Sequence, residues 1–382
     1  MPVTPAPSAA PRGAEPLSVR AWSVEEFSAS QALWDTLLSE SQADPLFMSW
    51  QWQWGWWKHH SRALAATARI VAVYAGNRLV GLAPFYSHTV RVRKVLKQRR
   101  LELIGIAWRD SRAFFSDYPD IIAAESFREG VVRAIDEWLA GERFWDELAL
   151  CCIKRTSVAA ELSSRRLGRW TFVREVDELT GWTAPLPASF QDYLAGLSPD
   201  IRRRLFNQRR KLTNPRFTYA SGAEVPDTLE ALWRLSAARW GGGKPLEHVQ
   251  EFHREMTARL SESGELRLSR LTHGEETISI LYCIERSGTV YYLQSGFDPA
   301  RAQGLSPGLL HFGYAIEAAC EQGMKEFDFL AGRGRHRDYK RDLLTHEVPV
   351  VSRQAVRGAV TGALYRAYER LQRRRTPLEL GS

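Results

Sequence analysis

The 382-residue chain lacks several features that would mark a membrane, secreted or metal-binding protein. No run approaches 18 apolar residues, so we expect no membrane-spanning helix. Residues 1–16 are rich in proline and alanine and lack an apolar segment after a basic start, which predicts a disordered tail and no signal peptide. Cysteine is scarce and shows no metal-ligand spacing. The four cysteines, which we expect to be buried thiols in a reducing cytoplasm, are Cys151, Cys152, Cys283 and Cys320.

Familiar nucleotide-binding and nucleophile motifs are also missing. Neither the dinucleotide-binding pattern G-x-G-x-x-G nor the P-loop G-x-x-x-x-G-K-S/T occurs at the loop described below. No serine or cysteine lies in a nucleophile elbow, which disfavours a covalent enzyme intermediate. What remains is a chain with 44% hydrophobic and 25% charged residues and a formal charge of +8. This composition is typical of a globular protein, and the length suits two domains.

One stretch carries most of the functional information. A strand at Val290–Gln294 is followed by a glycine-containing loop, a helix at Pro307–Gln322 and a second strand at Glu326–Leu330. Ser306 is a good helix cap, and proline suits the first helical position. Backbone N–H groups at such a helix start attract anions, above all phosphates. The order of these elements predicts a nucleotide or coenzyme A site.

The loop itself resembles the pyrophosphate loop of GNAT acyltransferases. That loop reads R/Q-x-x-G-x-G/A, and Arg301, Gly304 and Ser306 match it, with serine where glycine or alanine is usual. The resemblance implies that these residues, with Gly308 and Leu309, hold an acyl-CoA. Acetyl-CoA or another acyl-CoA is therefore the expected co-substrate, with no metal.

A wider set of motifs resembles one branch of this superfamily. Y-Y-L-Q-S-G-F-D-P, S-P-G-L-L, F-D-F-L-A-G and D-Y-K occur in the order found in the CelD/BioF-like acetyltransferases, named for cellulose biosynthesis and related to the Fem aminoacyl transferases. A tryptophan-rich segment near residue 50 extends the resemblance over most of the chain. It implies an α/β fold of mixed sheets flanked by helices, arranged as tandem GNAT-like domains.

An internal repeat supports two copies of one unit. Hairpins with turns at Gly76-Asn77 and His273-Gly274 are each followed by extended sequence, a helix and an apolar strand. The helices are expected at 126–140 and 307–322. Two unrelated α/β domains are the alternative. The predicted division is a tail at 1–16, domains at 17–182 and 183–352, of which only the second carries the anion loop, and a basic C-terminal helix and tail at 353–382.

Three residues near the second strand are candidate catalytic groups. Asp328 lies between Phe327 and Phe329, so its side chain points to the opposite face, where it could orient or deprotonate an acceptor. Tyr339 could protonate the departing thiolate, and Lys340 could stabilise an oxyanion or a substrate phosphate. The alternatives are that Asp328 only caps a loop or forms an ion pair, and that the Tyr-Lys pair is a surface feature.

Four further residues are predicted to bind the acceptor. They are Tyr292, Gln294, Asp117 and Arg333. Asp117 lies in a long loop of the first half with Asp110, Tyr118 and Asp120, and these residues either bind a cationic or hydroxyl-rich acceptor or only cap turns.

Aromatic and basic segments have two possible roles. Tryptophans at residues 50, 54 and 57 share one helical face, which favours core packing over sugar binding. The helix expected at 201–211 is crowded with arginine, and either is simply solvated or lies beside the donor or substrate. Residues 354–375 are expected to form a helix that docks on the protein or touches anionic lipid.

The combined prediction is an acyl-CoA-dependent N- or O-acyltransferase that transfers the acyl group directly. The resemblance implies an envelope or exopolysaccharide precursor as acceptor, and a polysaccharide synthase complex as a possible partner. One alternative is a Fem-like enzyme that uses aminoacyl-tRNA, the sole role expected for nucleic acid. The other is a non-catalytic component of a polysaccharide synthase. We expect a cytoplasmic protein with at most peripheral membrane contact.

Overall fold

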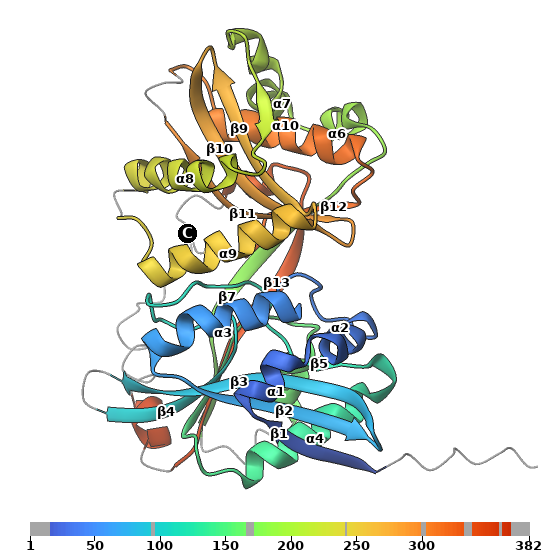
Figure 1. Ribbon diagram of the computed structural model, residues 1–382, viewed down its shortest axis with the longest axis vertical. Coiled ribbons are helices and arrows are strands. Elements are labelled where there is room, and N and C mark those ends of the chain that lie inside the picture. Colours follow the sequence, from blue (N-terminus) through green and yellow to red (C-terminus); the bar gives the residue numbers. More distant parts are fainter. Residues whose placement is uncertain are drawn as a thin grey trace, which may run out of the picture.

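The computed structural model describes residues 16–92, 96–165, 172–240, 243–298, 303–331, 338–358 and 361–367. The predicted tail at 1–16 falls almost entirely outside these ranges. Figure 1 shows two lobes stacked along the long axis of the molecule. We refer to β1–α5 as the first half and to α6–α11 as the second half. Strands β7 and β13 run between the two halves.

The first half begins with strand β1 and three helices, which are followed by the other strands of the half. One long helix, α4, lies between the last two strands. Its elements are β1 (Leu17–Trp22), α1 (Val24–Ala29), α2 (Gln31–Ser39), α3 (Trp50–Leu64), β2 (Thr67–Ala75), β3 (Arg78–Val92), β4 (Leu96–Leu103), β5 (Ile122–Ala123), α4 (Arg128–Gly141), β6 (Glu147–Lys154) and α5 (Val158–Arg165).

The second half repeats this arrangement. The remaining elements are β7 (Phe172–Pro185), α6 (Phe190–Gly196), α7 (Pro199–Leu205), β8 (Phe217–Tyr219), α8 (Glu224–Trp240), α9 (Glu247–Glu262), β9 (Leu266–His273), β10 (Glu276–Arg286), β11 (Thr289–Phe297), α10 (Pro307–Glu321), β12 (Glu326–Asp328), α11 (Asp338–Arg341) and β13 (His346–Val356).

All strands join one 13-stranded mixed sheet with a symmetric order. The order is β1-β2-β3-β4-β6-β13-β7-β12-β11-β10-β9-β8, with β5 paired to β3. In each half an antiparallel hairpin leads to a strand that pairs in parallel with its successor, and one helix connects the two. Helices α4 and α10 hold equivalent places in the order of elements. The predicted repeat and the predicted α/β fold class are confirmed.

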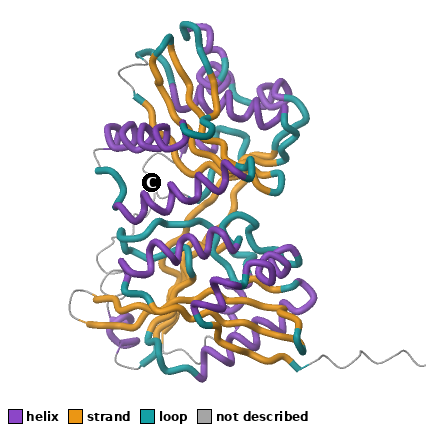
Figure 2. Tube along the Cα trace, in the orientation of Figure 1, coloured by secondary structure: helices purple, strands orange, loops and turns teal. Residues whose placement is uncertain are grey.

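Strands β7 and β13 connect the halves by exchange. β7 follows the first half but pairs with β12 of the second, and β13 follows the second half but pairs with β6 of the first. The two strands also pair with each other along most of their length. Figures 1 and 2 show them running together between the lobes. Strand β7 runs through the predicted boundary between residues 182 and 183.

The sheet opens where β11 leaves β12. Only Thr289–Tyr291 pair with Glu326–Asp328, while β11 continues to Phe297 beside β10. A bulge at Leu293 interrupts the β10–β11 ladder, because Cys283 pairs with Tyr292 and Tyr282 pairs with Gln294. The extra residue reverses the alternation of side chains along β11.

One apolar cluster extends across both halves, and the tryptophans of α3 belong to it. Trp52 and Trp56 of α3 are fully buried in a cluster that also holds Phe252 of α9. Trp52 packs edge-on against Phe252, with ring centroids 5.2 Å apart. This contact joins the two halves. Of the three tryptophans predicted to pack in the core, Trp50 and Trp57 are buried and Trp54 is partly buried against the same cluster, so that prediction is confirmed. All four cysteines are free and buried, also as expected.

Two predicted helices differ from the structure. Residues 354–356 belong to β13, because Gln354, Ala355 and Val356 pair with both β6 and β7, so the helix expected from residue 354 is wrong there. Residues 361–367 are helical, and the arginines at 373–375 lie outside the described residues. The arginine-rich helix ends at Leu205, and residues 207–211 form a separate 3-10 turn.

Candidate active site at the junction of the two halves

Asp328 ends β12 on the side of the sheet away from α10. Phe327 and Phe329 pack with α10 in one apolar cluster, so the strand turns Asp328 to the opposite face, as predicted. Its side chain is 3% exposed, and Oδ1 accepts hydrogen bonds from Leu330 N at 2.7 Å and from Tyr118 Oη at 3.1 Å. Leu330 has a positive φ of 59°, which turns the chain sharply after the strand.

A loop of the first half reaches this strand end. Asp117 Oδ1 accepts a hydrogen bond from Ala331 N at 3.0 Å, and Tyr118 is the donor to Asp328. Tyr118 has a φ of 53°, a backbone conformation that non-glycine residues rarely adopt. Such strain persists only where the surrounding structure imposes it, and it concentrates at functional sites. The site is therefore built from both halves.

Lys154 and Asp44 complete the charged cluster. The Lys154 ammonium lies 4.1 Å from the centre of the Tyr118 ring and 3.5 Å from Asp44 Oδ2. Asp44 is itself buried, and its Oδ1 accepts from the backbone N–H groups of Leu46 and Phe47. The Lys154 side chain is 34% exposed, so it is the member of this cluster that reaches solvent most.

Burial dominates the ionisation of the two central carboxyl groups. It raises the pKa of Asp328 to about 7, against the opposing charge of Lys154 and the hydrogen bond from Leu330. It raises the pKa of Asp117 to about 6, against the hydrogen bond from Ala331 and the charge of Lys340. Among the described residues, neither carboxyl group forms an ion pair. A group whose pKa lies near the working pH is suited to accept and release a proton.

Lys340 contacts the chain segment after Asp328, and its neighbour Tyr339 packs against α10. The buried Lys340 ammonium donates to the carbonyl groups of Phe329 at 2.5 Å and Leu330 at 3.2 Å, directly after Asp328. The Tyr339 ring stacks on Phe312 of α10, with centroids 6.1 Å apart. Tyr339 thus lies with the α10 layer, whereas Asp328 lies on the other face of the sheet.

The two predicted acceptor residues on β11 point in opposite directions. Tyr292 packs edge-on against Phe312 of α10, and its hydroxyl lies 2.8 Å from Ser295 Oγ. Gln294 donates to Ser236 of α8 at 3.2 Å. The bulge at Leu293 explains this separation, since residues two apart in a regular strand share one face. Arg333, the fourth predicted acceptor residue, lies outside the described residues.

The start of α10 has the free backbone N–H groups that the predicted anion site requires. Pro307 is its first residue, and the N–H groups of Gly308 and Leu309 fall in the first turn, where intrahelical partners are missing. Leu309 is buried, so only its backbone can serve a ligand. Gly304 has a φ of 72°, and a Cβ there would meet no heavy atom within 4 Å. Arg301 lies outside the described residues.

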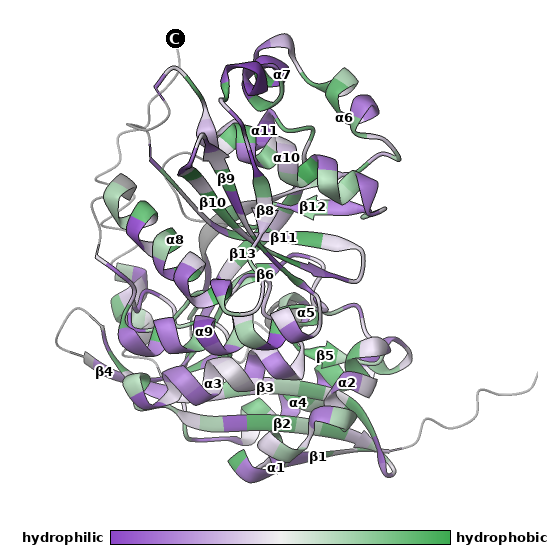
Figure 3. Ribbon diagram, turned by 45° about the horizontal axis from the view of Figure 1, so that its top comes forward, coloured by the Kyte–Doolittle hydropathy of each residue, from purple (hydrophilic) through white to green (hydrophobic). Residues whose placement is uncertain are grey.

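The arginine-rich segment packs along α10. Arg204 Nε donates to Ser306 Oγ at 3.3 Å, and Gln208 Oε1 accepts from Ser306 N at 2.9 Å. Further along the helix, the Arg209 guanidinium forms an ion pair with Glu317 and lies 3.8 Å from the centre of the Tyr314 ring. Figure 3 shows the hydrophilic colouring of this region around α7. A cation therefore stands beside the helix start.

Two other acidic residues of the first-half loop have structural contacts. Asp120 accepts from Ala159 N at 2.8 Å and Val158 N at 3.4 Å, which caps α5. Asp110 forms an exposed ion pair with Arg112. The alternative of turn capping is thus confirmed for Asp120, and Asp110 makes a local surface contact.

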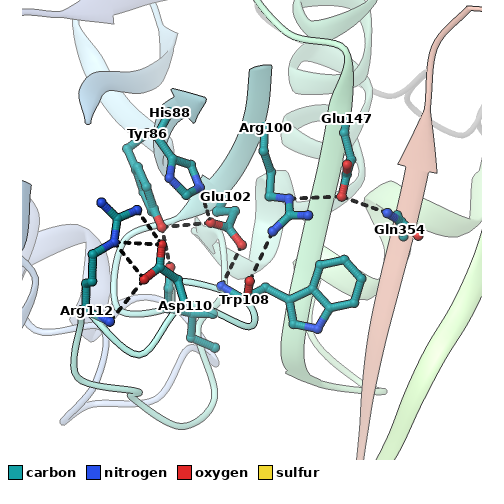
Figure 4. Close-up of polar contacts among 10 residues, drawn as sticks. Tyr86, His88, Arg100, Glu102, Trp108, Asp110, Arg112, Glu147 and Gln354 are labelled. Carbon is teal, nitrogen blue, oxygen red and sulfur yellow. Dashed lines mark hydrogen bonds and ion pairs between the residues drawn. The ribbon is translucent and has the colours of Figure 1, made fainter. Parts of the chain in front are cut away.

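A second buried charged network lies within the first half. In Figure 4, Arg100 of β4 bridges Glu147 Oε1 at 2.9 Å and the carbonyl of Trp108 at 3.0 Å. Glu102 accepts from Tyr86 Oη at 2.9 Å and Trp108 N at 2.8 Å, and its Oε2 lies 2.7 Å from His88 Nε2. Gln354 of β13 also belongs to the network, and its side-chain amide donates to Glu147 Oε1 at 2.7 Å. The network therefore ties the exchanged strand to the first half.

Metal ions need a characteristic set of ligand side chains, and membrane-spanning helices need a characteristic length. No group of three or more histidine, cysteine, aspartate and glutamate side chains in the described part of the chain is placed to hold a metal ion. Among the same residues, none of the helices combines the length and apolar character needed to span a bilayer.

Comparison with known families finds a match within the second half. Residues 199–341 match the family model described as an acetyltransferase (GNAT) domain. The matched GNAT segment runs from the first residue of α7 to the last residue of α11. It contains the helix start at Ser306, Asp328 and Lys340, but it covers less than half of the 382 residues. No curated protein matches the sequence.

Solved structures match almost the whole chain in fold. FemX aligns with a TM-score of 0.59 and 11% identity, over 88% of this chain and 98% of its own. A tandem GNAT protein from the clavulanic acid biosynthesis pathway has a TM-score of 0.50, 12% identity and coverage of 90% and 99%. The C-terminal domain of a putative lysylphosphatidylglycerol synthetase from Agrobacterium fabrum also gives 0.50, at 10% identity and coverage of 89% and 95%. At such identity the likeness concerns the fold, which is that of a tandem GNAT protein.

Sequence reasoning missed three residues of the site. Asp44 reads as a turn residue before a proline, and Lys154 as the polar end of an apolar strand. Gly181 lies among other strand residues of β7, and a Cβ atom there would lie 2.6 Å from Tyr118 Oη. No local pattern marks any of the three, because their neighbours at the site are distant in the sequence. Asp44 and Lys154 meet within the first half, 110 positions apart.

Proposed function

We propose that this protein is an acyl-CoA-dependent acyltransferase whose acceptor binds at the junction of the two halves. The observation that carries the proposal is Asp328, a buried carboxyl group without an ion-pair partner among the described residues and with a pKa near 7. It ends the strand that follows α10, and the start of α10 is suited to a phosphate group. One GNAT unit thus combines a proton acceptor with an anion site.

In the proposed reaction, the acceptor N–H or O–H group loses its proton to the Asp328 carboxylate. The acceptor atom attacks the thioester carbonyl carbon, and the carbon–sulfur bond breaks. Tyr339, which lies on the α10 face of the sheet, is the proposed proton donor to the departing thiolate. We propose that the thioester lies in the opening between β11 and β12, where groups from both faces could reach it. Lys340 holds the chain after Asp328 through the carbonyl groups of Phe329 and Leu330, and we propose that its charge also favours the oxyanion.

We propose that the donor diphosphate lies on the N–H groups of Gly308 and Leu309. The guanidinium of Arg204 and the hydroxyl of Ser306, which are already in contact, would lie beside it. Arg301 and Gly304 belong to the same proposed loop. This arrangement uses the helix dipole and a cation together, and both favour a dianionic group.

The proposed acceptor is an envelope or exopolysaccharide precursor, such as an amino sugar or a nucleotide sugar. Support comes from the resemblance of the sequence motifs to the CelD/BioF-like acetyltransferases. Asp117 and Lys154 are the residues that would meet its polar groups, and Tyr292, Gln294 and Arg333 stay candidates. A polysaccharide synthase complex, with peripheral membrane contact at most, is the partner that this acceptor implies.

A Fem-like reaction with aminoacyl-tRNA is the second candidate. The fold likeness to FemX and the basic segment beside α10 favour it. Binding of charged tRNA that weakens steeply with salt would support this candidate, since phosphate contacts release counterions. Acetyl-CoA turnover without tRNA binding would exclude it.

The donor site can be tested with two neighbouring arginines. We expect acetyl-CoA to raise the melting temperature of the wild type, since ligand binding stabilises the folded state. Arg204→Gln should weaken acetyl-CoA binding by roughly tenfold, because a charge-assisted hydrogen bond is lost. Arg203→Gln is the matched control, because both arginines lie on α7 and pair with Asp200 at the surface, whereas Arg204 is the one that reaches Ser306. Equal affinities for the two variants would move the donor elsewhere.

The acceptor is then found by measuring CoA thiol release from acetyl-CoA with a panel of amino sugars and nucleotide sugars. Thiol release that depends on the acceptor, together with the acetylated product by mass spectrometry, would establish the transfer. A protein that binds neither CoA nor tRNA would instead be the non-catalytic component.

A further inference from the structure

Gly181 lies where the exchanged strands pair. It belongs to β7 and faces Val348 of β13 across the ladder. A Cβ atom at residue 181 would lie 2.6 Å from Tyr118 Oη and 3.2 Å from Val348 Cβ. The first separation is far shorter than a van der Waals contact. Any side chain at residue 181 would therefore require the Tyr118 hydroxyl to move.

That hydroxyl is the group that donates to Asp328 Oδ1 at 3.1 Å. Tyr118 has little room to yield, because its side chain is buried between an aromatic ring and a cation. The Phe47 ring lies edge-on at 6.2 Å between centroids, and the Lys154 ammonium lies 4.1 Å from the ring centre. The backbone of Tyr118 is already in the left-handed region. A side chain at residue 181 would thus act mainly on the contact with Asp328.

We propose that Gly181 is a positioning residue for acyl transfer, because its missing side chain lets Tyr118 of the first half reach Asp328 of the second. The proposal rests on the proposed function, in which Asp328 takes the acceptor proton. A hydrogen bond donated to a carboxylate favours its ionised form. Gly181 touches no substrate and acts only through Tyr118. The exchange of β7 thereby couples the first half to the chemistry of the second.

The test compares the pH dependence of kcat/KM for wild type, Gly181→Ala and Tyr118→Phe. Both substitutions remove the hydrogen bond to the carboxylate, so Asp328 should ionise at higher pH. We expect the acid limb of the profile to move upward by up to about one pH unit in each variant. In the double variant the shift should equal that of Tyr118→Phe alone, because the atom that clashes with the new methyl group is then absent.

Gly81→Ala is the matched control. Gly81 also lies in a strand, β3, and a Cβ there would approach Val131 of α4 to 2.5 Å, away from Asp328. This variant should lose stability while its pH profile stays that of the wild type. If Gly181→Ala leaves the acid limb unchanged, or shifts it equally with and without the Tyr118 hydroxyl, the positioning role is overturned.

A second readout does not depend on activity. We compare the free energy of unfolding of each protein with that of its Asp328→Asn derivative over a range of pH. The difference between the two reports the ionisation of Asp328. Its midpoint should rise in the Gly181→Ala background by the same amount as the acid limb. An unchanged midpoint overturns the inference even if no acceptor is found, whereas a shifted midpoint in a protein without transfer activity contradicts the proposed function alone.

Discussion

Two clusters of buried charge, one inside the first half and one between the halves, differ in how their charges are balanced. In the first-half network, Arg100 stands between Glu147 and the Trp108 carbonyl. Glu102 accepts hydrogen bonds from the Tyr86 hydroxyl and the Trp108 backbone N–H, and it lies beside His88. Burial lowers the pKa of Arg100, but the charges of Glu147 and Glu102 raise it overall. Of the carboxylate oxygens of Glu102 and Glu147, only Glu147 Oε2 has no hydrogen-bond partner in the described structure.

The junction cluster is balanced much less completely. Asp117 and Asp328 accept backbone and phenol hydrogen bonds, but no cation in the described residues pairs with either, and the pKa of each rises. Burying a carboxyl group without a counter-charge costs stability, and a fold retains such a group where it has a use. The comparison teaches that burial alone does not mark a functional carboxyl group. A missing counter-charge makes a buried carboxyl group a candidate, and a place at the junction distinguishes Asp328 from Asp120, which caps α5.

The largest effect expected from this comparison is on turnover by Asp328→Asn. The substitution keeps the shape and removes the proton acceptor, so kcat should fall by about 100- to 10,000-fold with acetyl-CoA binding retained. Asp120→Asn is the control, because burial also raises the pKa of Asp120, to about 6, but its side chain caps α5. The thiol-release assay should show near-normal turnover for Asp120→Asn. Equal turnover in all three proteins would remove Asp328 from the mechanism.

Breaking the balanced network should cost stability. Arg100→Met leaves Glu147 and Glu102 buried without their cation, and we expect the free energy of unfolding to fall by about 3–5 kcal/mol in urea denaturation. Arg99→Met is the control, since the neighbouring Arg99 pairs with Asp146 at the surface and such pairs contribute about 0–1 kcal/mol. Similar losses for the two variants would contradict the distinction between the clusters.

The unbalanced cluster should make the free energy of unfolding fall as the pH rises. The pKa of Asp328 is higher in the folded than in the unfolded chain, so the folded state binds the extra proton between about pH 4 and 7. The neutral carboxyl group therefore makes its full contribution to the free energy of unfolding below about pH 4, and this contribution is lost as the pH rises through 7. Relative to wild type, Asp328→Asn should gain on the order of 2–3 kcal/mol between pH 5 and pH 9. A constant difference across this range would mean that Asp328 titrates normally.

A smaller effect should follow from Lys154. Its charge is the strongest influence that lowers the pKa of Asp328 against burial. Lys154→Met keeps the length of the side chain and removes the charge, so the acid limb of kcat/KM should move upward by roughly one pH unit. Arg155→Met is the control, because Arg155 pairs with Glu175 at the surface. A shift of the acid limb to lower pH in Lys154→Met would contradict the assigned electrostatics.

Much of the fold could be read from local patterns. Alternating apolar residues and glycine turns predicted the hairpins of β2–β3 and β9–β10, and Ser306-Pro307 predicted the start of α10. The helix expected over 354–375 failed at its beginning, because apolar residues at 356 and 360 fit a helical period but Val356 completes a strand between β6 and β7. A short apolar run cannot show whether it will pair with strands that lie far away in the sequence.

The candidate site was predictable only in part. Asp328 could be found because it interrupts an apolar strand, and a carboxyl group in such a place needs a reason. Asp117 was chosen from a loop of several acidic residues, and Tyr118 and Asp120 in the same loop turned out to differ in role. Tyr292 and Gln294 could not be separated in advance, since the bulge at Leu293 depends on the pairing with β10.

The sequence by itself determined the hairpins and the start of α10, that two similar units follow one another, and that only the second has a helix start suited to phosphate. These properties depend on neighbours within a few residues, through side-chain period, capping and turn preference. The tertiary structure alone decided that β7 and β13 exchange, that Gly181 admits the Tyr118 hydroxyl, and that Asp44 and Lys154 join Asp328. Those contacts link residues far apart in the chain, and their energies depend on burial and distance, which are fixed only when the chain has folded.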